Sequence, residues 1–161
     1  MCKFTTVEAD MYILLVVLQT VVLPLASGAI HLSVAGGKPL VVFASWWAFW
    51  GVGTRLTTAG VSQLFNPRWT AKGILGIANA GAEQVVHELA YANLSFGLIA
   101  LVAAFAPGWG ILGAVAGATY LGFAGFRHLA KRGKNPNETV ATWTDLLVFA
   151  IVAVGAAAMV F

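Results

Sequence analysis

The fold is decided by residues 11–35, MYILLVVLQTVVLPLASGAIHLSVA, which contain no Asp, Glu, Lys or Arg. A bilayer core of about 30 Å needs about 20 apolar residues in a helix, so this run is long enough to cross once. The whole chain has the same character, because 60% of its 161 residues are hydrophobic and only 9% are charged. This composition predicts an all-α, polytopic transmembrane helical bundle in one domain, and it excludes soluble catalytic folds.

Proline and glycine divide the rest of the chain into four further expected spans. Pro39 follows two glycines and a lysine, Pro67 ends the next apolar run, and Pro107 divides a 38-residue stretch without formal charge. Each proline disfavours helix at or before its position, so each marks a turn between spans. The five expected helices are residues 11–35, 40–65, 83–106, 108–129 and 142–161, with a loop or re-entrant segment at 68–82 and a basic loop at 127–138.

Basic residues gather on one side of this five-helix arrangement, while the other side has only Lys38. Because cytoplasmic loops are enriched in Lys and Arg, this distribution predicts a multi-pass membrane protein with the N-terminus cytoplasmic and the C-terminus outside. Nine basic residues with a net charge of +3 are what topology alone supplies, so nucleic acid is not an expected partner. The basic side carries Lys3, Arg68, Lys72, Arg127, Lys131, Arg132 and Lys134.

Two other features concern the N-terminal part. Residues 25–29, LASGA, loosely resemble a signal-peptide cleavage site, but the apolar run is too long for a signal-peptide core and acidic residues precede it. We therefore expect a retained helix. Cys2 is the single cysteine, which excludes an intramolecular disulfide and thiolate metal clusters.

Charged residues inside the expected spans fall at similar depth. Arg55 in the second span and Glu88 in the third both lie in the predicted cytoplasmic half, so a pair between Arg55 and Glu88 or Glu83 would offset the cost of burial. Asp145 in the last span is similarly placed to meet Arg127. Two interpretations stay open: a structural ion-pair network, or a ligand or transport site.

The span 83–106 has a polar stripe. Gln84, Glu88 and Tyr91 follow one another at spacings of four and three, and His87 adjoins them. Such a face is expected to point into the bundle, where it would form a pocket or buried polar network with Arg55, Asn93 and Asp145. No group of residues has the spacing of a metal site, but His87 and His128 are candidate ligands for a haem b iron, although His128 lies among basic residues.

Small residues in the span 108–129 predict close helix packing. Gly113 and Gly117 stand four residues apart, in the spacing that lets another backbone approach. The pattern does not distinguish a helix of the same chain from another subunit, so a homo-oligomer or membrane partner subunits stay open. The tryptophans fall mostly near expected helix ends, which is typical of an aromatic belt at the membrane interface.

From the second span onward, a series of short motifs follows in this order: Trp46–Trp50, Phe65, Ala71–Gly76, Glu88, Asn93–Leu94, Gly97, Asn135–Asn137 and Asp145. In this order the chain resembles an uncharacterised branch of the DoxX-like small bacterial membrane proteins, which implies a bacterial cytoplasmic (inner) membrane. Gln63 stands where that branch usually has a histidine, and the Ser-Pro-Phe-Gln run that precedes the Glu is absent. The resemblance implies a compact helical bundle, sometimes associated with quinone-linked respiratory enzymes, without an established activity.

No nucleophile elbow, phosphate-binding loop or zinc-protease motif occurs in the chain. The polar residues at matching depth in an otherwise apolar chain favour a non-enzymatic membrane module that binds a quinone or a lipid-like amphiphile and acts as an accessory subunit. A proton-coupled transporter or channel that uses Glu88 and His87 is the first alternative. A haem b redox protein that uses His87 and His128 is the second.

Overall fold

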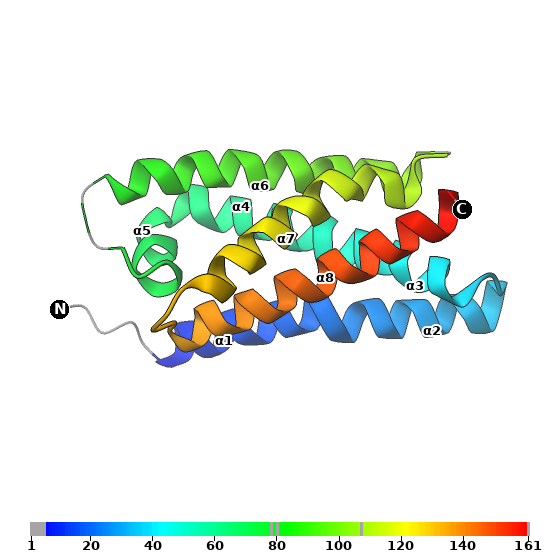
Figure 1. Ribbon diagram of the computed structural model, residues 1–161, viewed down its shortest axis with the longest axis horizontal. Coiled ribbons are helices and arrows are strands. Elements are labelled where there is room, and N and C mark those ends of the chain that lie inside the picture. The colour runs from blue at the N-terminus through cyan, green and yellow to red at the C-terminus, as the bar shows by residue number, and fades with distance from the viewer. Residues whose placement is uncertain (1–5, 78, 80, 107, 161) are drawn as a thin grey trace.

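The computed structural model describes residues 6–77, 79, 81–106 and 108–160, with side chains from Asp10 onward. Within these ranges every regular element is helical and the long helices lie lengthwise in one bundle (Figure 1). The all-α expectation is therefore confirmed for the described chain. Cys2, Lys3 and Pro107, which figured in the sequence analysis, lie outside the described residues.

Helices run up and down the bundle, and several are built from consecutive α, π or 3₁₀ segments. The first half comprises α1 (Thr6–Val17), the π-helical η1 (Leu18–Val22), α2 (Leu23–Ala35), α3 (Pro39–Trp47), the π-helical η2 (Ala48–Thr54) and α4 (Arg55–Phe65). The second half comprises α5 (Pro67–Trp69), the π-helical η3 (Thr70–Ile74), α6 (Ala82–Phe105), the 3₁₀ segment η4 (Gly110–Ala114), α7 (Val115–Ala130) and α8 (Pro136–Val160).

Three helices in the described chain are long and apolar enough to cross a membrane: Asp10–Ala35, Ala82–Phe105 and Pro136–Val160. The expected count of five spans is not confirmed. The run from Pro39 to Phe65 is helical throughout, but its tryptophans, glycines and Arg55 lower its mean hydropathy, and α7 has only 16 residues.

The last helix begins earlier than expected. We expected it to start at residue 142 because residues 135–139 are polar, but α8 begins at Pro136. Proline suits the first turn of a helix, where its missing N–H is not needed, and the Asn135 side chain accepts the amide of Glu138 at 2.8 Å. Part of the loop expected at 68–82 is also helical, because α5 and η3 cover residues 67–74.

A proline in the first helix is matched by a hydrogen bond from the second. Pro24 has no amide hydrogen to donate to the carbonyl of Thr20, four residues earlier. The indole nitrogen of the buried Trp47 donates to that carbonyl at 2.8 Å. The carbonyl of Thr20, which Pro24 cannot bond, is thus the acceptor of a hydrogen bond that holds two helices together.

Two further tryptophans join the same pair of helices. Trp50 Nε1 donates to Ser27 Oγ at 3.0 Å, and Trp46 Nε1 donates to His31 Nδ1 at 3.3 Å. The sequence analysis treated these tryptophans as parts of an interfacial belt. In the structure their indole groups act as donors between helices.

Glycines bring the central helices into close contact. A Cβ added at Gly117 would lie 2.5 Å from Val52 Cγ1, and one at Gly113 would overlap Ala103. These two glycines therefore pack against η2 and α6 of the same chain. The apolar core of the bundle lies around Val52 of η2, Ile111 of η4 and Val148 of α8.

Candidate ligand-binding site

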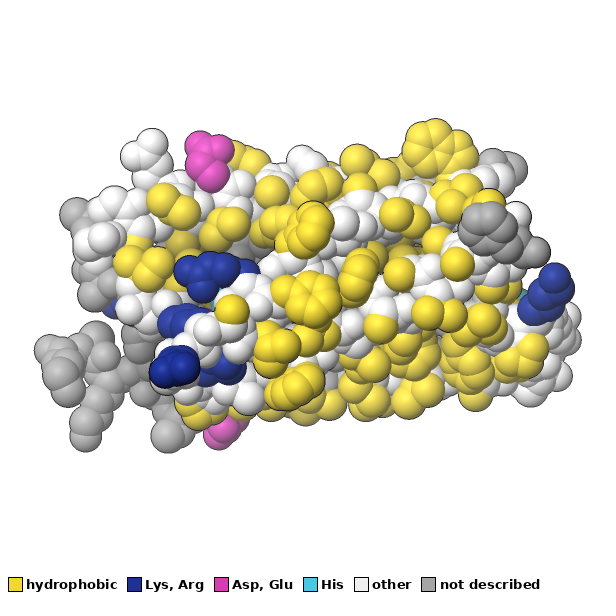
Figure 2. Space-filling model, in the orientation of Figure 1, with side chains coloured by type: hydrophobic (Ala, Val, Ile, Leu, Met, Phe, Trp, Pro, Cys, Tyr) yellow, Lys and Arg dark blue, Asp and Glu magenta, His cyan; other side chains and the backbone are white. Residues whose placement is uncertain are grey.

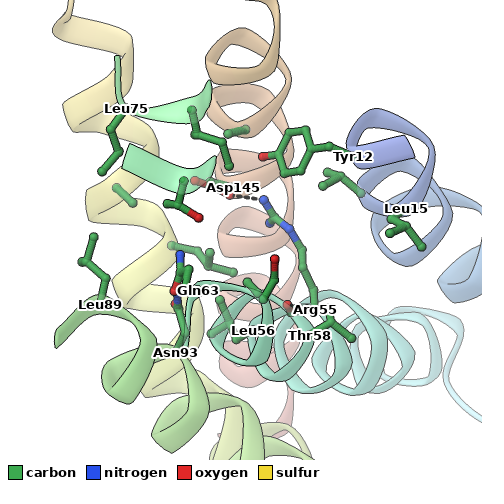
Figure 3. Close-up of a pocket in the computed structure, with 18 of the residues that line it drawn as sticks. Tyr12, Leu15, Arg55, Leu56, Thr58, Gln63, Leu75, Leu89, Asn93 and Asp145 are labelled. Carbon is green, nitrogen blue, oxygen red and sulfur yellow. Dashed lines mark hydrogen bonds and ion pairs between the residues drawn. The ribbon is translucent and has the colours of Figure 1, made fainter. Parts of the chain in front are cut away.

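A cavity of about 740 Å³ lies at the end of the bundle where α6 begins and α7 ends. Its walls come from α1, α4, α6, α7 and α8, and α5 and η3 contribute Trp69, Thr70 and Ile74. Most of the lining is apolar, and its polar side chains converge from several helices (Figure 3). Cavities of about 300–1,000 Å³ with this mixture are typical of small-molecule sites.

An ion pair lies in the wall of the cavity. Arg55, at the first turn of α4, donates from Nη2 to Asp145 Oδ1 of α8 at 2.5 Å and to Thr144 Oγ1 at 3.2 Å. The side chains of Arg55 and Asp145 are only 9% and 6% exposed. The second terminal nitrogen, Nη1, is buried without a hydrogen-bond partner among the described side chains. A buried donor left unpaired carries a desolvation cost that an added acceptor would relieve.

Tyr12 approaches the pair from the first helix. Its ring comes from α1 and directs its hydroxyl towards Arg55 and Asp145 (Figure 3). The other side of the ring packs against Trp69 of α5, with centroids 5.2 Å apart. Tyr12 therefore links the first helix, the ion pair and the short helix that closes the end of the cavity.

A second polar contact lies across the cavity. Asn93 of α6 donates from Nδ2 to Gln63 Oε1 of α4 at 2.7 Å, and Asn93 is buried. Both side chains line the cavity, on the wall formed by α4 and α6 (Figure 3). Gln63 thus takes part in the candidate site at the position where the resemblance called for histidine.

A buried carboxylate bonds side chains from the end of α7 and the link to α8, next to the cavity. Glu138, in the first turn of α8, is 1% exposed, and two side chains lie within hydrogen-bond distance of its carboxylate. His128 Nδ1 lies 2.9 Å from its Oε1, and Lys131 Nζ lies 2.9 Å from its Oε2. His128 also lines the cavity. This cluster fixes the end of α7 against the start of α8.

The same cluster holds η3 and the residue that follows it in place. Lys131 Nζ donates to the carbonyl of Leu75 at 3.2 Å, and Asn135 Nδ2 donates to the carbonyls of Gly73 and Ile74, each at 3.2 Å. Both donors lie in the link between α7 and α8. The segment that covers the cavity therefore depends on the buried cluster around Glu138.

One exposed side of the cavity is a seam between the first helix and α4, which we define by Leu15, Gln19, Thr58 and Ser62. All four residues line the cavity, and Leu15, Thr58 and Ser62 are exposed on the surface of the bundle. Gln19 and Thr58 contact each other across the seam through their side chains at 3.4 Å. A contact of that length is a weak closure.

The structure places several expected site residues elsewhere. Gln84, Glu88 and Tyr91 are exposed on the outer face of α6, so the expectation that this stripe faces the interior was wrong. The inner face of α6 carries small residues instead, such as Ala90 and Gly97, which let it pack closely on α4. Of the expected pocket residues, Arg55, Asn93 and Asp145 line the cavity.

The expected ion-pair partners were also wrong. Arg55 pairs with Asp145, not with Glu88 or Glu83, and Glu83 pairs with Arg68 on the surface at 2.7 Å. Depth along the helices did place Arg55 and Asp145 in the same half of the bundle. Depth alone does not determine the direction in which a side chain leaves its helix. The half-buried His87 does not line the cavity, so the structure does not pair it there with His128 as a haem site would require.

Glu138 and Tyr12 were not predicted as site residues. A signal for Glu138 was present, because Glu138, Thr142 and Asp145 follow one another at spacings of four and three, which puts them on one helix face. All three are buried. The polar residues at the start of α8 are typical of a loop, so the sequence did not predict that Glu138 belongs to this helix face.

Comparisons of the chain with protein-family models, curated proteins and solved structures found no match. The site is therefore interpreted from its own geometry.

Proposed function

We propose that this protein is a membrane-embedded, non-enzymatic module that binds an amphiphile, such as a quinone or another lipid-like molecule, in the cavity between α1, α4 and α7. The observation that carries the proposal is an apolar cavity of about 740 Å³ with a buried, unpaired donor of Arg55 in its wall. An amphiphile offers a chain for the apolar lining and an acceptor for the donor.

The proposal includes five spans in a bacterial cytoplasmic membrane, with the N-terminal end inside. It is supported by the distribution of charge, because Lys and Arg side chains gather at the end of the bundle where α1 begins (Figure 2). At the opposite end, where α2 turns into α3, the sequence offers Lys38. Cytoplasmic ends of membrane helices carry such an excess of basic residues. We also propose that the chain is a member of the DoxX-like proteins and that it serves as an accessory subunit.

A cavity-filling variant tests the proposal. Ala124 of α7 lines the cavity, whereas Ala116, two turns earlier on the same helix, is exposed on the bundle surface. We would purify the full chain in mild detergent and measure co-purifying lipid and quinone by native mass spectrometry and solvent extraction. The wild type and Ala116→Trp are expected to retain one amphiphile per chain, and Ala124→Trp is expected to lose it while keeping its helical content.

Two results would contradict the proposal. One is a wild-type protein that never retains an amphiphile above the level left by detergent exchange. The other is an Ala124→Trp variant that folds and retains the same ligand as Ala116→Trp, which would place the ligand outside the cavity.

A further inference from the structure

The charged groups around the cavity do not cancel. The charged side chains in its described lining are Arg55, Arg127 and Asp145, with His128 beside them. Asp145 is paired with Arg55, and the neighbouring carboxylate of Glu138 is occupied by Lys131 and His128. The lining therefore keeps a net positive charge, which belongs to Arg127.

Arg127 is available for a ligand. It lies in the last turn of α7, it is exposed at the edge of the cavity, and it has no ion-pair partner among the described side chains. Its guanidinium carries five N–H donors in a planar fork that suits carboxylate and phosphate oxygens. Arg55 of α4, which also lines the cavity, adds the buried and unpaired Nη1 donor.

Membrane topology by itself also accounts for basic residues at this end. Arg132, five residues after Arg127, is exposed there and does not line the cavity. Arg127 differs from Arg132 because it lines the apolar cavity, whose lining also holds the buried, unpaired Nη1 of Arg55. Arg132 therefore serves as a matched control that changes the same charge at the same end.

We propose that the cavity selects an anionic amphiphile with one alkyl chain, whose carboxylate or phosphate head is bound by Arg127 and by Nη1 of Arg55. The chain lies along the apolar lining towards Leu56 and Leu121. A single chain suits a volume of about 740 Å³, which is in the range of drug-sized ligands. This inference rests on the proposed function and adds the class of head group.

The test compares heads on matched chains. The delipidated full chain in a neutral detergent is titrated with palmitate, palmitoyl lysophosphatidate, methyl palmitate, decylubiquinone and acetate, and binding is measured by native mass spectrometry. We expect palmitate or lysophosphatidate to bind about tenfold or more tightly than the neutral methyl palmitate and decylubiquinone, since charge-assisted hydrogen bonds to arginine contribute at least that factor. Acetate, which lacks the chain, is expected not to bind.

Variants locate the selectivity. In Arg127→Gln the preference for the anionic heads is expected to fall to about twofold or less, in Arg127→Lys part of it is kept, and in Arg132→Gln it is unchanged. Arg127 is exposed, so these variants are expected to fold as the wild type does.

Equal binding of palmitate and methyl palmitate would overturn the anionic head and leave the proposed function standing. Equal losses in Arg127→Gln and Arg132→Gln would also overturn the assignment, because they would show an effect of overall charge. Failure of every amphiphile to bind would overturn the proposed function as well.

Discussion

Arg55 and Asp145, 90 residues apart in the sequence, meet at 2.5 Å between α4 and α8 inside the wall of the cavity. Removing one partner leaves the other charge buried without compensation, so Arg55→Gln is expected to lower the free energy of unfolding by about 3–5 kcal/mol. The matched control, Arg68→Gln, breaks an exposed pair with Glu83 and is expected to cost about 0–1 kcal/mol. Reversible denaturation in mixed micelles would measure both values.

A double variant separates stability from binding. Replacing both charges by apolar residues, as in Arg55→Met with Asp145→Leu, removes the unpaired charge and is expected to recover most of the lost stability. If Nη1 of Arg55 holds the ligand, this stable protein should no longer retain an amphiphile. A stable double variant that binds its ligand as the wild type does would show that the pair is structural only.

The bond from Trp47 to Thr20 makes a prediction about the first two helices. Trp47→Phe removes the buried indole donor that bonds the Thr20 carbonyl, and Pro24 has no amide hydrogen to replace it. We expect a loss of about 1–2 kcal/mol in unfolding free energy, as for other hydrogen bonds between membrane helices combined with lost packing. Trp143→Phe, at a position that is 61% exposed, is the control and should have little effect. Equal losses in the two variants would contradict the role of the hydrogen bond.

Close packing at Gly117 can be tested with one methyl group. Gly117→Ala places a Cβ against Val52 and Phe96, and overpacking of this kind costs about 1–3 kcal/mol. Gly81→Ala adds the same methyl group in open space, at a φ of −79° that alanine adopts freely, so it should leave stability unchanged or raise it slightly. Thermal unfolding of the two variants side by side measures the difference. A neutral Gly117→Ala would mean that α7 packs less closely than described.

Glu138 is expected to control the cover of the cavity. Glu138→Gln removes the negative charge that holds Lys131 and His128, and Lys131 in turn holds the carbonyl of Leu75. Amide hydrogen exchange in residues 67–77 should therefore become faster by about tenfold, while α6 and the rest of α8 exchange as before. Glu88→Gln, on the exposed face of α6, is the control and should change nothing there. Unchanged exchange in Glu138→Gln would contradict the link between the buried cluster and η3.

Much of the helix arrangement could be predicted from the chain. Pro39 and Pro67 begin helices because proline is accepted in the first helical turn, and the long apolar runs set the lengths between them. Pro136 obeys the same rule, but the polar residues after it resemble a loop when their burial is unknown. Their role becomes clear only when Asn135 is seen to cap the helix and Glu138 to pair inside it.

The site was harder to predict than the fold. Depth along a helix follows from counting residues, and it placed Arg55 and Asp145 in the same half of the bundle. The direction of a side chain depends on which face packs, and on α6 the packing face is defined by alanine and glycine at Ala90, Gly97 and Ala100, not by the polar stripe. The polar stripe therefore predicted the wrong face of α6, because this stripe lies on the side that does not line the cavity.

The seam between the first helix and α4 affects how an affinity for this protein should be expressed. Exposed Leu15, Thr58 and Ser62 lie in the seam, on the sides of helices that the proposed topology sets in the bilayer. A ligand that enters there comes from the lipid phase, after it has already partitioned out of water. The quantity that sets occupancy is then its mole fraction among the lipids. Dissociation constants measured at different detergent or lipid concentrations will agree only when they are written on that scale.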